Sequence, residues 1–229
     1  MTISSNNIAN STGLETAKYL LDIKAVNFRP NQPYKFTSGW VSPVYIDCRW
    51  IISFVEARRR IIELGCDMLE KNVGVDQFDV IAGGETAGIP YASWISESLS
   101  KPMLYVRKEA KGFGRNAQIE GNLKKKSKVL LVEDLATDGG SKINFVNALR
   151  NAGAHVTDIF VIFFYSVFPD SLTNLKEAGV KLHHLATWHD VIKIAEEGDY
   201  FSRKSIEDVK AFLQDPVGWS KAKGGRGVG

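Results

Sequence analysis

The sequence predicts an α/β fold built on a doubly wound, mainly parallel sheet, with a smaller appendage. Short apolar runs without alternating polar residues begin at Val80, Met103, Val129 and Ile159. Such runs are typical of strands that are buried on both faces. Stretches with helical spacing lie between these runs, and strands interleaved with helices form parallel sheets. The length of 229 residues, with no Pro- or Ser-rich linker in the middle, favours one domain.

The N-terminal quarter differs from the rest of the chain. Residues 1–12 are rich in Ser and Asn, and we expect them to be flexible. Thr12 to Glu15 has the form of a capping box and predicts a helix from Thr12, with apolar residues at helical spacing behind it. Residues 36–48 are broken by Gly and Pro and rich in aromatic and β-branched residues, which predicts short strands and a turn. A helix over 55–69 follows.

The remaining elements alternate between strand and helix. The predicted strands cover 80–84, 103–107, 129–134, 159–164 and 181–187, and the predicted helices cover 89–99, 142–151, 171–178 and a segment after Trp188. In parallel α/β sheets, ligands bind beyond the carboxyl ends of the strands. We therefore expect the site in the segments that follow the first, second and third of these strands.

Composition excludes several classes of protein. There are 29 Lys and Arg against 26 Asp and Glu, and the formal net charge of +3 is too small for a dedicated nucleic-acid binder. No apolar stretch is long enough to span a membrane, and the N-terminus lacks the order of a secretory signal. Cys48 and Cys66 have no metal-ligand spacing, and two free thiols suit a reducing compartment. We expect a cytoplasmic protein that binds neither nucleic acid nor membrane, with a flexible, glycine-rich tail over 219–229.

Residues 129–142, VLLVEDLATDGGSK, carry the strongest chemical signal. Glu133 and Asp134 end an apolar run, where their carboxylates can accept hydrogen bonds from a ribose diol. The backbone N–H groups of 136–141, with the positive end of the next helix, can hold a phosphate dianion. A generic strand, turn and helix would not need this combination. Paired acids and a Thr-Asp-Gly-Gly-Ser turn therefore favour a phosphorylated sugar as the ligand.

At these residues the chain resembles the type I phosphoribosyltransferases, whose signature is a hydrophobic strand, two acids and a Thr/Gly-rich phosphate loop. Residues 36–47, FTSGWVSPVYID, and 107–112, RKEAKG, with the GGETAGIP of 83–90, narrow the resemblance to the orotate phosphoribosyltransferases. The resemblance implies one phosphoribosyltransferase domain over 13–218. Residues 13–50 would contribute its N-terminal helix and a small hood subdomain.

The resemblance also implies the substrates and the residues that bind them. The substrates are orotate and phosphoribosyl pyrophosphate, Mg²⁺ bridges substrate oxygens near the two acids without direct protein ligands, and the family's mobile loop implies a homodimer with shared sites. The catalytic residues would be Arg107, Lys108 and Lys111. Phosphoribosyl pyrophosphate would meet these three and also Glu133, Asp134, Leu135, Ala136, Thr137, Asp138, Gly139, Gly140 and Ser141. Orotate would meet Thr137, Tyr45 and Ile46.

The basic segment after the second strand has a physical purpose of its own. Arg107, Lys108, Lys111 and Arg115 carry positive charge, and glycines nearby give the backbone freedom. Pyrophosphate leaves an anomeric carbon that acquires oxocarbenium character, so cations must stabilise the leaving group and water must be excluded. A basic lid would do both.

Some positions depart from the family pattern. Thr37 and Ala87 stand where a Lys is usual, Phe113 stands where a His is usual, and the run that ends FFYSVF lacks the Arg that commonly meets the orotate carboxylate. Two alternatives therefore stay open. One is a phosphoribosyltransferase for a purine or another pyrimidine. The other is a non-catalytic regulator that senses phosphoribosyl pyrophosphate, although such a protein could dispense with the basic lid.

Overall fold

The structure is a computed structural model that describes residues 5–36, 39–110, 118–137, 140–167 and 171–226. The chain divides into two compact units. The first contains Met1–Ala57, Tyr165–Phe168 and Ala186–Gly229, and the second contains Arg58–Phe164 and Pro169–Leu185.

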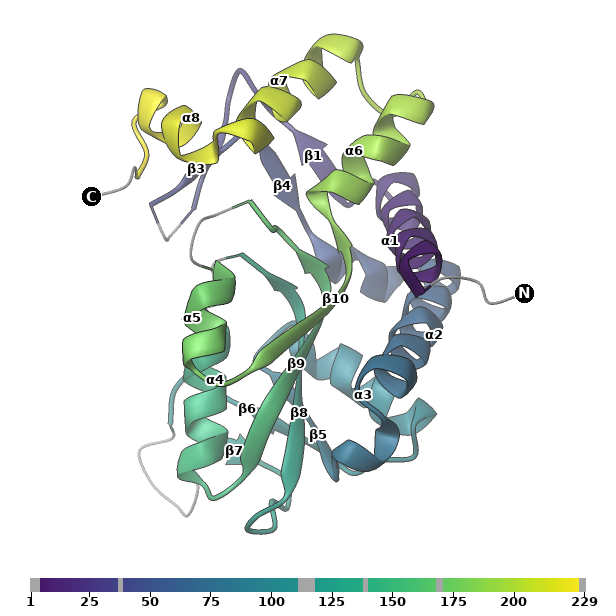
Figure 1. Cartoon of the computed structure of the whole chain (residues 1–229), viewed down its shortest axis with the longest axis vertical. Coiled ribbons are helices and arrows are strands. Elements are labelled where there is room, and N and C mark those ends of the chain that lie inside the picture. The colour runs from purple at the N-terminus through teal and green to yellow at the C-terminus, as the bar shows by residue number, and fades with distance from the viewer. Residues whose placement is uncertain (1–4, 37–38, 111–117, 138–139, 168–170, 227–229) are drawn as a thin grey trace. The chain divides into compact units, whose positions relative to one another are not determined.

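The second unit is built on a sheet in the strand order β10, β9, β8, β5, β6, β7 (Figure 1). These strands are β5 (Val80–Gly84), β6 (Met103–Val106), β7 (Ile119–Glu120), β8 (Lys128–Ala136), β9 (His155–Phe164) and β10 (Lys181–Thr187). The β5–β6, β5–β8 and β8–β9 pairs are parallel, and the short β7 pairs antiparallel with β6. The predicted fold class, a mainly parallel α/β sheet, is confirmed.

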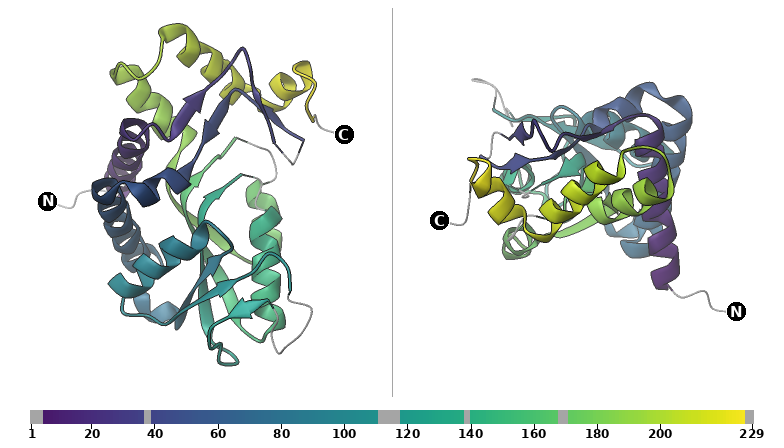
Figure 2. Two further views of the ribbon diagram at one scale, coloured as in Figure 1. Left: turned by 180° about the vertical axis from the view of Figure 1, so that it is seen from behind. Right: turned by 90° about the horizontal axis from the view of Figure 1, so that it is seen from above.

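Helices cover both faces of this sheet, as a doubly wound fold requires. On one side lie α2 (Val55–Asn72) and α3 (Gly88–Ser98), and on the other lie α4 (Gly140–Asn151) and α5 (Ser171–Glu177) (Figures 1 and 2). A short 3-10 helix, η2 (Val75–Gln77), precedes β5. The helix α2 lies close to the sheet, since a Cβ on Gly65 would be 2.9 Å from the ring of Phe160.

Strand order places the functional segments at one point of the sheet. From β5 the chain moves outward to β6, and from β8 it moves outward in the other direction to β9. The neighbours β5 and β8 therefore flank the topological switch point, beyond whose strand ends open α/β sheets bind their ligands. The segments 85–87 and 137–141 follow directly from these two strand ends.

The strand β8 is longer than the sequence predicted. Leu135 and Ala136, which we expected in the phosphate loop, are its last residues and pair with Phe163 and Phe164 of β9. They join the ladder because the apolar run of β9 extends far enough to pair with them. The loop after the two acids therefore begins at Thr137.

The first unit combines helices with two small antiparallel sheets. The strands β1 (Val26–Phe28) and β4 (Val44–Ile46) pair with each other, as do β2 (Tyr34–Lys35) and β3 (Val41–Ser42). The helices are α1 (Ser5–Asp22), η1 (Cys48–Ser53), α6 (Trp188–Glu197), α7 (Arg203–Gln214) and α8 (Pro216–Ala222). C-terminal residues thus share this unit with residues 13–50, for which the sequence predicts an N-terminal helix and a hood.

Both chain ends hold more structure than their composition predicted. The helix α1 begins at Ser5, so 5–12 are helical, and it packs against α6, where a Cβ on Gly13 would be 2.8 Å from the Asp190 carboxylate. At the other end, Asp215 caps α8 by accepting from the N–H of Gly218, and the N–H of Arg226 donates to Gly39 O at 2.8 Å. Composition reveals neither the packing of α1 against α6 nor the capping of α8.

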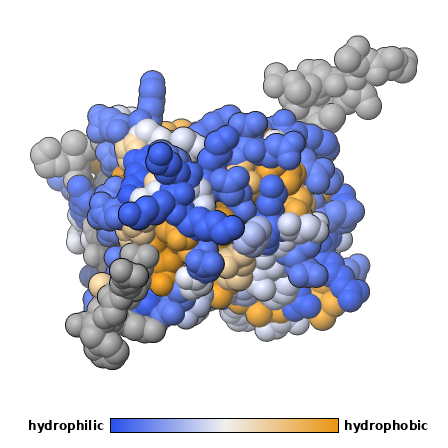
Figure 3. All heavy atoms as spheres, turned by 90° about the horizontal axis from the view of Figure 1, so that it is seen from below, coloured by the Kyte–Doolittle hydropathy of each residue, from blue (hydrophilic) through white to orange (hydrophobic). Residues whose placement is uncertain are grey.

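None of the helices in the described part of the chain is long and apolar enough to cross a membrane. Figure 3 shows one face of the molecule, on which hydrophobic areas are separated by hydrophilic side chains. This pattern is ordinary for protein surfaces, which always expose some apolar atoms.

Candidate active site

The two predicted acids lie near the carboxyl end of β8 and are both buried. The exposed fractions of Glu133 and Asp134 are 6% and 8%. Ionised carboxylates are costly to bury without a partner. Burial raises the pKa of the Glu133 carboxyl to about 7, and the nearby Lys142 ammonium opposes that rise. Asp134, whose charge raises the same pKa further, is the adjacent acid in the strand.

Lys142 is the direct partner of Glu133. It lies in the first turns of α4 with an exposed fraction of 6%, and its Nζ is 3.1 Å from Glu133 Oε2. The same Nζ is 3.2 Å from the hydroxyl of Ser141. One buried cation therefore joins a predicted sugar-binding acid to a predicted phosphate-binding residue. This lysine is not among the residues predicted from the sequence.

Two glycines make room for the Glu133 side chain. A Cβ on Gly88 would lie 2.6 Å from Glu133 Oε1, and a Cβ on Gly84 would collide with the same oxygen. Gly84 is the last residue of β5 and Gly88 the first of α3, and both belong to the GGETAG of residues 83–88. Glu133 Oε1 has no hydrogen-bond partner within the described residues. The site thus contains a buried acceptor that a donor group on a ligand could satisfy.

The predicted phosphate loop continues from β8 into α4. Thr137 is half-buried and follows the strand, and Gly140 and Ser141 form the exposed first turn of the helix. The N–H groups of a first helical turn have no partner in the helix and attract anions. Asp138 and Gly139, also predicted here, lie outside the described residues.

The basic segment is the connection of a β-hairpin formed by β6 and β7. The N–H of Arg107 donates to Gln118 O at 2.8 Å, and the Gln118 side-chain amide donates to Arg107 O at 3.0 Å. The N–H of Lys108 donates to the carboxylate of Glu85 at 2.7 Å, which fixes the hairpin base to the GGETAG segment. Lys111, Arg115 and Phe113 lie outside the described residues.

The side chains at the hairpin base differ in their surroundings. The guanidinium of Arg107 is 3.7 Å from Glu120 on β7, and each of these side chains is about one-third exposed. Lys108 is exposed. Among the described cations of the predicted lid, Lys108 is thus the one with its side chain open to solvent.

The predicted orotate contacts of the first unit lie in an aromatic cluster. The ring of Tyr45 is 5.1 Å from that of Tyr34 and 6.5 Å from that of Phe36, measured between centroids. The guanidinium of Arg29 lies 5.1 Å from the centroid of Tyr34. Ile46 is fully buried and pairs with Val26 of β1, so the predicted contact of this residue with orotate finds no exposed surface here. Thr37, beside this cluster in sequence, is not among the described residues.

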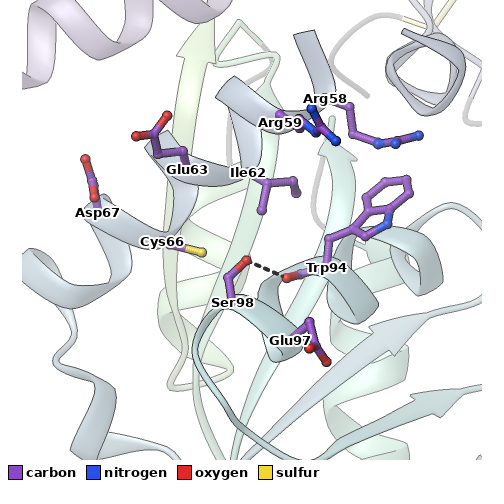
Figure 4. A pocket seen from close by; sticks show the side chains of 9 residues that line it. All are labelled: Arg58, Arg59, Ile62, Glu63, Cys66, Asp67, Trp94, Glu97 and Ser98. Carbon is purple, nitrogen blue, oxygen red and sulfur yellow. Dashed lines mark hydrogen bonds between the residues drawn. The ribbon is translucent and has the colours of Figure 1, made fainter. Parts of the chain in front are cut away.

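A separate pocket of about 390 Å³ lies between α2 and α3 (Figure 4). The guanidinium of Arg58 lies 4.7 Å from the centroid of Trp94, and the Ser98 hydroxyl donates to Trp94 O at 2.9 Å. Burial raises the pKa of the Cys66 thiol to about 11, which leaves it unreactive. Of the predicted site residues that the structure describes, none lines this pocket.

Comparison with known proteins identifies the family. The profile of the phosphoribosyl transferase domain matches residues 59–181, more than half of the chain. The orotate phosphoribosyltransferase of Sinorhizobium fredii is 48% identical over 212 residues, which cover 93% of this chain and 91% of that protein. This chain belongs to the orotate phosphoribosyltransferase family. The predicted resemblance is confirmed.

Solved structures of this family have the same fold. The orotate phosphoribosyltransferase of Aeropyrum pernix is 30% identical with a TM-score of 0.68, over 80% of this chain and 98% of that one. Leishmania donovani UMP synthase is 29% identical with a TM-score of 0.77, over 88% of this chain and 42% of that one. As a phosphoribosyltransferase the protein is an enzyme of pentosyl transfer.

The site contains two features that sequence reasoning missed, and one of them had a signal. Lys142 shares one face of α4 with Phe145, Val146 and Leu149, all of which are buried. A lysine at the head of an apolar stripe with 3- and 4-residue spacing indicates a buried cation that needs a partner. The bond from Lys108 to Glu85 had no such signal, since the two residues are 23 positions apart.

Proposed function

We propose that this protein transfers the ribose 5-phosphate group from phosphoribosyl pyrophosphate to orotate, producing orotidine 5'-monophosphate and pyrophosphate for UMP synthesis. The observation that carries the proposal is the buried acid pair near the carboxyl end of β8, with α4 beginning at Gly140 a few residues later. This arrangement offers acceptors for a diol next to donors for a phosphate.

The acids and the loop would hold the sugar phosphate. Glu133 and Asp134 would accept hydrogen bonds from the ribose hydroxyls, and the unpartnered Oε1 of Glu133 gives one such bond a place. The backbone from Thr137 to Ser141 would hold the 5-phosphate, with the hydroxyls of these two residues as further donors. Leu135 and Ala136 would contribute as the end of the strand rather than as loop donors.

The cations of the hairpin would close over the pyrophosphate. Arg107, Lys108 and Lys111 would stabilise the negative charge that the leaving group gains as the bond to the anomeric carbon breaks. The contact between the N–H of Lys108 and Glu85 supports this assignment, because it holds the hairpin base beside the segment that follows β5.

Mg²⁺ would bind at the same end of the sheet. Hard oxygen ligands suit this ion, which usually keeps one or two carboxylates nearby and takes the rest of its shell from phosphates and water. Glu133 and Asp134 fit that description, and substrate oxygens would hold the ion. Bound there, Mg²⁺ would neutralise charge on the pyrophosphate.

The aromatic cluster of the first unit would receive the pyrimidine. The ring of Tyr45, which packs against Tyr34 and Phe36, would offer a face to the base. Arg29, at 5.1 Å from the Tyr34 ring, is a cation within this cluster. The positive charge of Arg29 supports an anionic base as the ligand. Orotate is such a base, because it carries a carboxylate in addition to the phosphates of the other substrate.

A turnover assay tests the choice of base. Pyrophosphate release should depend on orotate and on Mg²⁺, and should be absent with uracil, hypoxanthine or adenine. Activity with a purine and none with orotate would favour the related transferases. Tight binding of phosphoribosyl pyrophosphate without turnover of any base would favour the regulator.

The lid assignment predicts a large loss on removal of its lysine. Lys111→Ala should lower kcat about 100-fold with saturating substrates, because a cation that stabilises the leaving group acts in the transition state. Lys176→Ala, which removes an exposed lysine of α5, serves as the control and should leave kcat unchanged. Full turnover by Lys111→Ala would contradict the lid.

We further propose a cytoplasmic homodimer in which the lid of one subunit serves the site of the other. The family resemblance supports the shared site, and the two buried free cysteines support a reducing compartment. Mixing Lys111→Ala with Asp134→Asn protein should restore activity that neither variant has alone, since one site of each mixed dimer would be intact. No restoration after subunit exchange would contradict sharing.

A further inference from the structure

We infer that Lys142 is a positioning residue for phosphoribosyl transfer: its buried ammonium holds the Glu133 carboxylate and the Ser141 hydroxyl in the arrangement that binds the sugar phosphate. The inference rests on the proposed function, because it assigns Glu133 to the diol and Ser141 to the phosphate. It adds a residue and a cause that neither the motif nor the family comparison assigns.

Burial makes this ion pair a fixed element. The side chains of Lys142 and Glu133 are 8% and 7% exposed, and their charged atoms are 3.1 Å apart. Removing one partner of such a pair leaves an uncompensated buried charge, which is far more costly than losing a surface pair. The lysine therefore cannot swing to solvent, and the carboxylate cannot turn away without losing its counterion.

The pair leaves one carboxylate oxygen for the ligand. Oε2 of Glu133 faces Lys142, whereas Oε1 lies among the Gly84 and Gly88 backbones with no partner in the described parts of the chain. Because both residues are glycines, they place no side chain of their own in that space. Lys142 thus determines which oxygen is engaged by the protein and which is left to accept a hydrogen bond.

The second contact couples the acid to the phosphate loop. The Lys142 ammonium donates to the Ser141 hydroxyl at 3.2 Å. This bond holds the hydroxyl oxygen in place in the first turn of α4. Lys142 and Ser141 are adjacent in the helix, so a shift of the lysine moves both contacts together. The spacing between the diol acceptor and the 5-phosphate donors is thereby held by one side chain.

Other charges around Glu133 do not replace this role. Asp134, next to it in β8, opposes ionisation of Glu133, and Lys108 of the hairpin base favours it more weakly than Lys142 does. Lys108 is also exposed, so water screens its effect. Lys142 is the cation that both contacts the carboxylate and is itself buried.

The test is steady-state kinetics of Lys142→Met, which keeps the length of the side chain and removes its charge. We expect the KM for phosphoribosyl pyrophosphate to rise about tenfold and the KM for orotate to change less than twofold. The acid limb of kcat/KM for phosphoribosyl pyrophosphate should move to higher pH, because Glu133 loses the cation that favours its ionised form. Lys142→Arg should restore most of the affinity, and Lys176→Met should match the wild type.

A coupling measurement separates positioning from direct contact. In a Glu133→Gln background, adding Lys142→Met should change the KM for phosphoribosyl pyrophosphate less than twofold, since the lysine has lost its main partner. A further tenfold rise would show that Lys142 acts on the substrate by itself and would overturn the inference. An unchanged KM and pH profile in folded Lys142→Met would also overturn it.

Two other outcomes can also be interpreted. If Lys142→Met does not fold, the comparison of Glu133→Gln with the double variant still applies, because removing both charges leaves no unpaired one. If the wild type itself shows no orotate-dependent release of pyrophosphate, the proposed function fails, and that result is distinct from any change caused by Lys142.

Discussion

Two segments of the second unit supply charge to the same predicted site by opposite means. Near the end of β8, Glu133 lies against the backbones of Gly84 and Gly88 and contacts Lys142 of α4, and both charged side chains are buried. At the hairpin, Lys108 is exposed, and the described anchors are the backbone bonds of Arg107 and Lys108 at its base. Packing therefore fixes the groups predicted to bind the sugar. Backbone hydrogen bonds of Arg107 and Lys108 fix the base of the hairpin that is predicted to bind pyrophosphate.

The physical reason lies in what each end must do. A neutral diol is recognised by acceptors in fixed positions, and a fixed charge is retained in low dielectric only with a buried partner. A leaving group must be enclosed and then released, so we expect its cations on a segment that is attached to the fold at its base. Changes at the two ends should therefore differ in kind: stability and affinity at β8, turnover at the hairpin.

The largest expected effect comes from filling the space that Glu133 occupies. Gly88→Ala puts a Cβ 2.6 Å from Glu133 Oε1 and in collision with the carbonyl of Val132, so either β8 or the start of α3 must shift. We expect a loss of about 3 kcal/mol in the free energy of unfolding. Urea unfolding measures it, with Thr86→Ala as a control in the same segment. Near-equal stability of the two variants would mean that the packing around Glu133 is loose.

A second prediction concerns how stability depends on pH. Glu133 has an ordinary pKa of 4.5 and a pKa of about 7 in the folded protein, so between these values the folded state holds a proton that the unfolded chain has released. The contribution of this group to stability is therefore greatest at low pH and falls as the pH rises through that window. The Glu133→Gln, Lys142→Met double variant lacks this titration.

We compare the free energy of unfolding of the double variant with that of the wild type. The difference should shift in favour of the double variant by on the order of 2 kcal/mol as the pH rises from 5 to 8. Urea unfolding at the two pH values measures the gain. A difference that stays constant with pH would show that Glu133 does not titrate in this window. The raised pKa of this buried carboxyl, which distinguishes it from the exposed charge of the hairpin, would then be contradicted.

The smallest expected effect sharpens the description of the hairpin. Glu85→Gln weakens the acceptor of the Lys108 N–H, a charge-assisted bond of 2.7 Å. We expect kcat to fall about fivefold, or about 1 kcal/mol, with little change in unfolding free energy. Glu120→Gln, which weakens the longer, 3.7 Å pair with Arg107, should change kcat less than twofold. Equal effects of the two variants would remove the special role of the Glu85 anchor.

Local patterns predicted much of this structure because they record burial on both faces of a strand. The runs at Val80, Val129 and Ile159 are strands β5, β8 and β9, and the acids at 133 and 134 end an apolar run as expected. Local patterns failed where neighbours decide the outcome. Ala136 belongs to β8 because β9 pairs with it, and residues 5–12 are helical in the α1 that packs against α6.

By itself, the sequence determined the fold class, the family and the positions of the charged segments, since these depend on periodicity and short motifs within one stretch of chain. Only the tertiary structure decided which groups meet. That Gly84 and Gly88 enclose Glu133, that Lys142 is its counterion and that Glu85 holds the hairpin base are contacts between different elements. The energetics of a buried charge depend on its distance to a partner, and the sequence records no distances.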